Sequence, residues 1–545
     1  MSHLSWRRLG ASVAAVAVAA SLTSISSPAQ ASAPAPLENG ASWLTAQLTN
    51  GVIQGQYGDD VGTTISTAYV LQVTGGHASD LDAIATAVGQ RLTGNTGYIE
   101  YNEGTEAVPQ MGYYANATAN ALVFAEALEK DPTTYGGVDL VDRLESLMVT
   151  TGPSAGRIAD DSVYGNYANS IGQALAARGL ADAGSADASA VSTSLAFLLD
   201  QQCDAGYFRL NFTNDPDAAD QSCQGGVASG DSAPDTDVTA LVIRQLEPLA
   251  SGDAAVATAI GKAKTWLADQ QHADGSFGGG PSTSAPNTNS TGLAGWALGT
   301  LGDTAAATKA ATWVRAHQVQ PLAPCATKLS NQAGAVAYDD AALSAGAKNG
   351  LTAATLGQWR LAAAQAVPVL QWAPAASGRF AASGPKGYRK AGTRATYSVA
   401  GVAPGSPVCA RVGSTTAVTT AGPSGRVSLV LTLPSGTANR TVSVTGVDAQ
   451  TSVTTKVLGK KKLKVKAAKK VKRGKKATVK VSGLAPHEKF TLRLGKKVVK
   501  HGTARANGTV KVKVKVGKKL HKVKIRVTGQ FGKIRKGVRT VKVVR

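Results

Sequence analysis

The sequence predicts a multidomain protein in which an all-α region of six helical hairpins precedes two all-β sandwich modules. A helix–turn–helix unit of about fifty residues recurs six times before residue 374. Beyond that point, short Val, Thr and Ser alternations are broken by Gly and Pro, which is typical of sandwich strands. The length of 545 residues also exceeds what one hydrophobic core usually supports.

The chain begins with an expected signal peptide, residues 1–31. Arg7 and Arg8 precede an apolar run, and Ala29 and Ala31 are the small residues that a signal peptidase accepts. We therefore expect an exported protein. No later apolar stretch reaches the roughly 20 residues needed to cross a bilayer, so we expect no transmembrane segment.

The helical region, residues 36–374, is marked by a turn that all six copies share. The second helices begin at Asn or Asp and continue with small and apolar residues at helical spacing. Stacked copies bury a core that none could bury alone, either as an open superhelix or as a closed double ring. The turns begin at Gly51, Gly97, Gly156, Gly206, Gly275 and Gly334.

The best-formed copy carries a family resemblance. Its turn Asp274-Gly275-Ser276-Phe277 and its helix Asn289-Ser290-Thr291-Gly292 resemble the prenyltransferase and squalene-oxidase repeats of the terpenoid-cyclase-like α/α-toroid families. Cobalamin carriers of the transcobalamin type are related to these families. The resemblance implies an (α/α)6 toroid whose second helices surround a central cavity, and it alone makes a cobalamin-like ligand conceivable.

The starts of the second helices would face one mouth of such a ring, which makes them the candidate ligand site. We align Asn169, Asp237, Asn289 and Asp339 as equivalent positions. Helix capping is the simpler role for Asn and Asp there, and lining of a ligand pocket is the functional one. The candidate ligand-binding residues are Tyr167, Asn169, Asp235, Asp237, Asn287, Asn289, Tyr338 and Asp339.

Asp237 is also the one weak catalytic candidate. The segment Asp235-Thr236-Asp237-Val238-Thr239-Ala240 is similar to the acidic motif of squalene-hopene cyclases, whose middle acid protonates an alkene while neighbouring carboxyl groups hold its proton. Val238 stands where that motif has its last Asp. Aromatic residues, which would stabilise carbocations, make up only 5% of the chain. We therefore expect no polyene cyclisation and favour a binding protein.

A secreted enzyme, terpene cyclase-like or carbohydrate-cleaving, is the alternative. A zinc prenyltransferase is disfavoured because no Cys accompanies a His at matching repeat positions, and we expect no metal site. Carbohydrate cleavage needs a pair of carboxyl groups. Acidic residues of the early loops could supply one, although solvated loop acids are the more ordinary explanation. They are Asp59, Asp60, Glu100, Glu103, Asp160 and Asp161.

Export permits disulfides, and the chain has four cysteines. Cys203 and Cys223 flank one loop, so we expect them to pair, which would contribute on the order of 3 kcal/mol in the chain-entropy model. Cys325 and Cys409 lie in different predicted domains. Two buried thiols are the expectation for them, and a second disulfide is the alternative.

The two β modules, residues 378–457 and 460–545, are expected to be immunoglobulin-like sandwiches, and their charges differ sharply. From Lys460 to Arg545 there are 32 Lys and Arg against one acid, Glu488, whereas the rest of the chain has 25 bases and 34 acids. Valines alternate with Lys511, Lys513 and Lys515, so these lysines share one face of a strand.

Such a module attracts polyanions by counterion release. For an exported protein, an anionic wall polymer or lipid surface is the expected partner. Nucleic acid is disfavoured, because Phe490 and Phe531 are the only aromatic residues there that could stack on bases. We therefore expect a protein retained at the cell envelope, with an unidentified small ligand in its ring.

Overall fold

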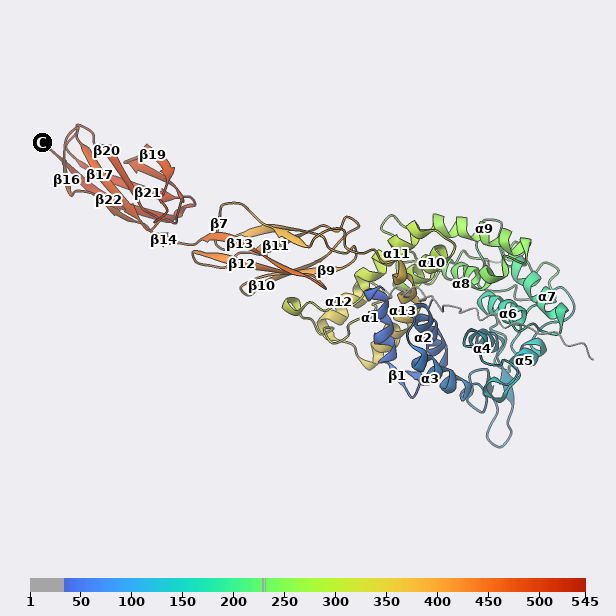
Figure 1. The fold of residues 1–545 in the computed structure, drawn as a ribbon. Helices are drawn as coiled ribbons and strands as arrows, with labels where there is room; N and C mark the ends of the chain where they lie inside the picture. The colour runs from blue at the N-terminus through green and yellow to red at the C-terminus, as the bar shows by residue number, and fades with distance from the viewer. Residues whose placement is uncertain (1–33, 228–229, 231) are drawn as a thin grey trace, which may run out of the picture.

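The computed structural model describes residues 34–227, 230 and 232–545, so the expected signal peptide lies outside the described residues. Across these ranges, thirteen α-helices come first and β-strands make up the C-terminal part (Figure 1). No helix in the described part of the chain is long and apolar enough to span a membrane.

Six helices form an inner ring. From α4 onward each packs on the next in chain order, and the last, α13, packs on α2 (Figure 1). Close packing depends on small residues: a Cβ on Gly292 of α10 would lie 2.3 Å from the Cα of Ala366 in α13. The inner helices are α2 (Val61–Thr74), α4 (Ala115–Ala127), α6 (Ser170–Asp182), α8 (Thr236–Leu246), α10 (Thr288–Thr300) and α13 (Ala353–Ala366).

Six further helices surround this ring, and each packs on the inner helix that follows or precedes it. Their buried apolar residues fall on one stripe, as in α9, where Val256, Ile260, Ala263 and Leu267 are buried. The outer helices are α1 (Ala35–Thr45), α3 (Ala78–Gly89), α5 (Leu140–Ser146), α7 (Ala188–Asp200), α9 (Ala254–Asp269) and α11 (Thr304–His317).

Five of the six shared turn glycines have a common packing role, whereas a Cβ on Gly97 would meet the carbonyl oxygen of Leu92 in the loop that precedes it. Gly275 has a φ of 95°, and a Cβ there would lie 2.6 Å from the carbonyl oxygen of Lys309 in the next outer helix. Gly51, Gly156 and Gly206 meet the next outer helix in the same way. Gly334, in the last copy, meets the carbonyl of Asn39 in α1. The contact that joins neighbouring copies therefore also closes the ring.

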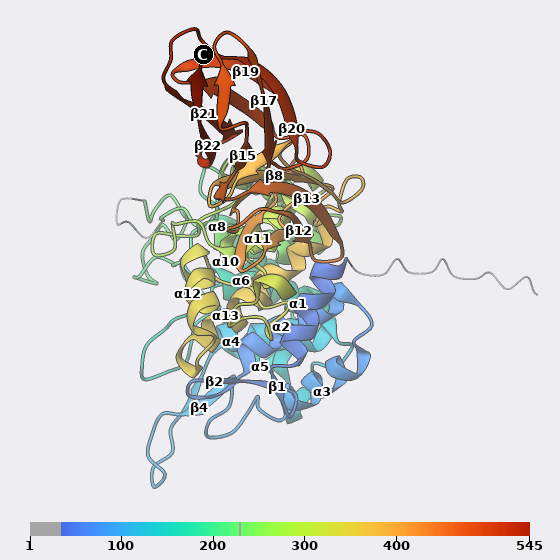
Figure 2. The same ribbon diagram turned by 90° about the vertical axis from the view of Figure 1, so that its left-hand side faces the viewer.

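The sixth copy departs from the expected pattern. The helix predicted to begin at Asp339 is α12 (Asp340–Asn349), in which Gly346 is the one fully buried position, and it lies at the edge of the helical part (Figure 2). The inner place belongs to α13, which continues into η4 (Val367–Trp372). The reason is apolar content, since α13 and η4 bury Trp359, Val367 and Leu370.

The first β module consists of two facing sheets, with strand orders β10-β9-β12-β13-β7 and β11-β8-β6. Its core between the sheets includes Tyr397, Leu429 and Val442. The strands are β6 (Ala381–Ser383), β7 (Tyr388–Lys390), β8 (Arg394–Ala400), β9 (Pro407–Val412), β10 (Thr415–Thr420), β11 (Val427–Thr432), β12 (Ala438–Thr445) and β13 (Gln450–Leu458).

The second β module repeats this plan, with a sheet of order β15-β17-β20 facing one of order β14-β22-β21-β18-β19, to which β16 adds by pairing with β22. Val479, Leu492 and Ile525 lie in its core. The strands are β14 (Lys461–Lys462), β15 (Lys464–Lys466), β16 (Lys470–Lys472), β17 (Lys476–Ser482), β18 (Lys489–Leu494), β19 (Lys497–Thr503), β20 (Val510–Lys515), β21 (Lys522–Gly529) and β22 (Gly532–Val544).

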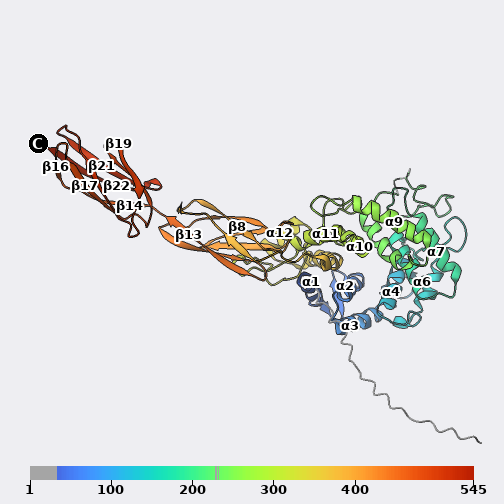
Figure 3. The same cartoon turned by 45° about the horizontal axis from the view of Figure 1, so that its top comes forward.

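The ring and the two modules lie in a row (Figures 1 and 3). A disulfide joins Cys325, after α11, to Cys409 in β9, so the expectation of two buried thiols was wrong. The buried Arg315 of α11 donates to the carbonyl oxygens of Pro374 and Pro404 at 2.7 and 2.9 Å. A covalent bond and a buried cation therefore attach the first module to the ring.

Candidate functional site

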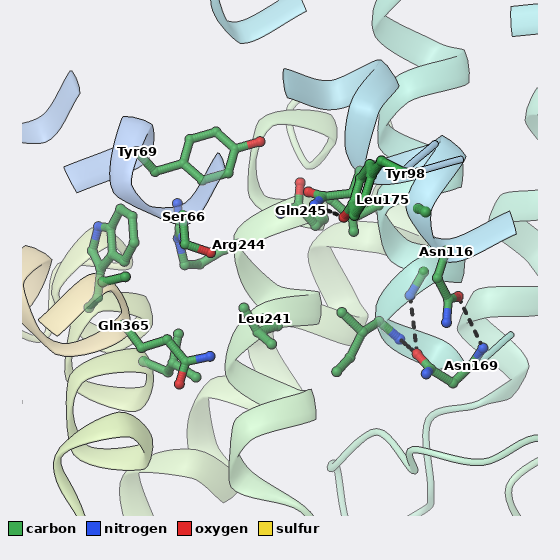
Figure 4. Close-up of a pocket in the computed structure, with 17 residues that line it drawn as sticks. Ser66, Tyr69, Tyr98, Asn116, Asn169, Leu175, Leu241, Arg244, Gln245 and Gln365 are labelled. Atoms are coloured by element: carbon green, nitrogen blue, oxygen red, sulfur yellow. Dashed lines mark hydrogen bonds between the residues drawn. The ribbon is translucent and has the colours of Figure 1, made fainter. Parts of the chain in front are cut away.

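A cavity of about 410 Å³ lies inside the inner ring (Figure 4). All six inner helices contribute to its wall, together with Tyr98 from the loop before α4. Polar and apolar side chains alternate around it. The lining residues are Ser66, Tyr69, Tyr98, Asn116, Ala117, Asn120, Asn169, Ile171, Gly172, Leu175, Leu241, Arg244, Gln245, Leu293, Trp296, Ala364 and Gln365.

A simple register places five of these residues. Each lies six positions beyond the N-cap of its helix, as Leu241 follows Asp235 and Leu293 follows Asn287. The five helices run in the same direction, and each has its own N-cap at the corresponding place. The sixth residue after each N-cap therefore faces the ring axis at a similar depth in the cavity. The five residues are Ser66, Asn120, Leu175, Leu241 and Leu293.

One turn deeper, Arg244 is the charged residue of the wall. Its guanidinium carbon lies 3.1 Å from the centroid of the Trp296 ring, and the Tyr69 hydroxyl is buried in the same part of the cavity (Figure 4). Burial lowers the pKa of Arg244 to about 10, so it remains a cation at neutral pH. Burial also raises the pKa of Tyr69. The sequence analysis missed this group, although Arg244 stands out as the one basic residue of α8, in its last turn.

Four of the eight candidate ligand-binding residues are the caps of their helices. Asn169 accepts hydrogen bonds from the backbone of Ile171 and Gly172, and Asp235, Asn287 and Asp339 cap α8, α10 and α12 in the same way. The alignment that made Asp237 and Asn289 equivalent to Asn169 was therefore shifted by two residues. Asn169 is the one of the eight that lines the cavity.

Asp237 and Asn289 lie two positions beyond their caps, where Asn116 and Ile171 line the cavity in other helices. Neither of these two side chains is among those that line the cavity. Asn289 donates to Gln365 of the wall at 2.6 Å. Burial raises the pKa of Asp237 to about 6, opposed by a hydrogen bond from Ser290 and assisted by the charge of Asp235. Val238 cannot provide the carboxyl neighbour that the acidic motif of the cyclases has after its middle acid, but Asp235 provides one on the other side of Asp237.

The remaining candidates are not gathered at the cavity. Tyr167 is 69% exposed. Tyr338 is partly buried, and burial is the main cause that raises its pKa; the charges of Asp237 and Asp339 raise it further.

The early acidic residues have separate structural partners. Asp59 pairs with Arg91, Asp60 caps α2, Glu100 pairs with Arg143, Glu103 accepts from Tyr114 and Ser162, and Asp160 accepts from the backbone of Ala115 and Tyr167.

Cys203 and Cys223 form the expected disulfide, in the loop between α7 and α8. In the described ranges, no group of three or more His, Cys, Asp and Glu side chains is arranged to hold a metal ion.

A second candidate surface lies on the last module. In the sheet β15-β17-β20 lysines stand opposite one another, with Lys466 facing Lys480, Lys480 facing Lys511, and Lys476 facing Lys515. All are exposed. Glu488 has no exposed surface and forms a buried ion pair with Arg535 at 2.6 Å. Because the one acidic side chain of the module is buried, no carboxylate side chain on its surface compensates the charge of the lysines.

No protein-family model matches this chain, and no curated protein sequence does. Among solved structures, a protein from Actinoplanes is 17% identical over 62% of this chain and 98% of its own, with a TM-score of 0.41. The type II terpene cyclase MstE from Scytonema is 15% identical over 62% and 96%, with a TM-score of 0.40. The Yersinia pseudotuberculosis adhesin InvE is 15% identical over 31% of this chain, which spans 58% of the adhesin, at a TM-score of 0.17. Scores this low carry no argument about activity.

Proposed function

We propose that the helical part is a toroid of the terpenoid-cyclase-like type whose central cavity binds a small ligand. The observation that carries this proposal is that every inner helix turns side chains into one cavity of about 410 Å³. This volume lies within the range of about 300–1,000 Å³ that is common for small-molecule sites. Apolar walls with a few convergent polar groups are also typical of such sites.

The experiment compares two Leu→Trp variants of the secreted protein. Leu241→Trp fills the cavity, whereas Leu361→Trp adds the same bulk on a side chain that is 40% exposed. After incubation with envelope extracts, we expect a small molecule to copurify with the wild type and with L361W. We expect L241W to retain less than about a tenth of it, because overpacking removes the space that it occupies. Equal recovery from all three proteins would contradict the proposal.

The same experiment tests the enzyme alternative. Its supporting observation is Asp237, a partly buried carboxyl group in the first turn of α8 with a pKa raised to about 6, as a general acid requires. A binding protein returns the recovered molecule unchanged. An enzyme converts it during incubation, and Asp237→Asn would then stop the conversion while leaving the recovery unchanged.

We further propose that the protein is exported and that the last module, an immunoglobulin-like sandwich, retains it on anionic polymers of the cell envelope. The facing rows of lysines support this, because like charges directly opposite in a sheet destabilise it unless an anion neutralises them. The two disulfides fit an oxidising location. Lys511, Lys513 and Lys515 of β20 belong to the lysine face that would bind the polymer.

A further inference from the structure

The cavity contains two hydrogen-bond donors that lack acceptors. Within the described part of the chain, Arg244 forms no hydrogen bond and no ion pair, and the buried hydroxyl of Tyr69 has no hydrogen-bond partner. Figure 4 shows both side chains on the same side of the cavity, next to Ser66. Two donors of this kind at one place indicate a missing acceptor.

Other arginines of the protein differ from Arg244 in this respect. Arg178 pairs with Asp182, and Arg535 pairs with Glu488. Arg143 gives the closest comparison, because it too lies over an aromatic ring, that of Tyr113, at 4.2 Å, yet it pairs with Glu100 at 2.9 Å. Arg157, over the Phe212 ring at 5.0 Å, has no carboxylate partner but donates to the carbonyl oxygen of Thr213 at 3.0 Å. Both of these stacked arginines therefore keep a hydrogen-bond acceptor, which Arg244 lacks.

Arg244 is partly buried in the cavity wall, and a cation withdrawn from bulk water is destabilising unless an opposite charge offsets the loss. The Arg244 guanidinium lies over the Trp296 ring. The planar set of N–H groups of a guanidinium matches the two oxygens of a carboxylate or phosphate. The cavity wall beside it is apolar, with Leu175, Leu241 and Leu293 at one depth.

We propose that the ligand of this cavity is amphipathic, with a carboxylate or phosphate group bound by Arg244 and Tyr69 and an apolar body against the three leucines. This inference rests on the proposed binding function and names its ligand class. Carboxylate and phosphate share the chemistry that the site recognises, so the test includes both.

The test uses the full secreted chain and three probes with the same alkyl length: decanoate, decyl phosphate and decan-1-ol. Titration calorimetry at fixed salt gives the affinities. We expect at least one anionic probe to bind about 10- to 100-fold more tightly than the alcohol, as charge-assisted hydrogen bonds allow. The tighter of the two anions identifies the head group.

Three variants assign the preference to its residues. Arg244→Gln should abolish the preference for an anion over decan-1-ol, and Tyr69→Phe should reduce that preference several-fold. Arg143→Gln, the stacked arginine outside the cavity, should keep it. Lysines of the last module are the same in all variants, so their contribution cancels. Circular dichroism checks folding, and Tyr69→Phe removes one hydroxyl only, which keeps the test valid if Arg244→Gln unfolds.

Equal binding of all three probes, or an anion preference that persists in Arg244→Gln, would overturn the inference. Failure of both anionic probes to bind would overturn it as well. In each case, a molecule from envelope extracts that L241W excludes would still support the proposed binding function, so the two ideas fail separately.

Discussion

Glu126, near the end of α4, is buried in an unusual way. Within the described residues, neither of its carboxylate oxygens has a hydrogen-bond partner. Burial and the negative charge of Asp182 raise the pKa of Glu126 to about 8, while the charge of Arg178 opposes them. In the folded protein this side chain therefore keeps its proton at a pH where an ordinary glutamate has lost it.

This pKa has a consequence for stability. Between about pH 4.5 and 8 the folded state holds a proton that the unfolded state has released, so the free energy of unfolding falls as pH rises. Glutamine is neutral throughout, and we expect Glu126→Gln to be more stable than the wild type at pH 9 by about 1–2 kcal/mol, after a discount for solvent screening of this partly exposed group. At pH 4 the two should agree.

Urea unfolding of the helical part at pH 4, 7 and 9 measures this difference. The control is Glu129→Gln, an exposed position just beyond the same helix, which should follow the wild type at every pH. A constant difference between Glu126→Gln and the wild type across the pH range would contradict the explanation.

Single residues were predictable where their role is local. Asn169 and Asp339 cap helices, as the sequence indicated, because the chemistry of a cap depends on the next three residues, which the sequence shows. Arg244 was not predicted because its importance depends on Trp296 and Tyr69, which come from other helices. Which polar side chains meet in the cavity depends on the packing of different helices, and the repeat pattern does not give that packing.

At the scale of helices and strands, the repeat pattern predicted the hairpins well until the sixth copy. There the Asn/Asp entry at Asp339 does begin a helix, but α12 has too few large apolar residues to hold an inner place. The inner position belongs to α13 and η4, whose apolar residues lie beyond the helix that begins at the repeated Asn/Asp entry. A helix start alone therefore does not determine which helix the core retains.

The same substitution in these two segments tests this assignment. Leu370 in η4 is fully buried, whereas Leu343 in α12 is partly exposed. We expect Leu370→Ala to lower the free energy of unfolding of the ring by about 2–5 kcal/mol, through lost burial and a cavity. Leu343→Ala should cost less than about 1 kcal/mol. Similar costs in urea unfolding would show that α12 contributes to the core as much as η4 does.

At the scale of the whole molecule, the first β module offers its own control for the second. The pairing of β8 with β11 matches that of β17 with β20, so Ser398, Ser428, Val430 and Thr432 correspond to Lys480, Lys511, Lys513 and Lys515. The two modules share a strand pairing and differ in the charge of one sheet face. The sequence predicted the alternation of lysine and valine along a strand. Which lysines lie opposite one another on neighbouring strands is known only from the strand register.

Transfer of the four residues of the first module to the second gives the variant K480S/K511S/K513V/K515T. We expect weaker cosedimentation of the full chain with isolated envelopes and a smaller dependence on salt, since fewer counterions are released. The control removes four exposed lysines of the helical part, Lys262, Lys309, Lys328 and Lys348. Retention that is insensitive to salt, or that the control variant reduces equally, would contradict the role of the lysine face.

The burial of Glu488 against Arg535 has a consequence for how the protein meets a surface. With its one acid hidden, the last module is cationic on all sides, while the remainder of the chain carries more acids than bases. Because the parts lie in a row, this makes the molecule an electric dipole along its long axis (Figure 1). A negatively charged wall attracts one end and repels the other, and within a few Debye lengths, about 8–10 Å each, the resulting torque turns the molecule before it touches. The helical part with its cavity would then lie on the side of the medium, where a diffusing ligand can reach it.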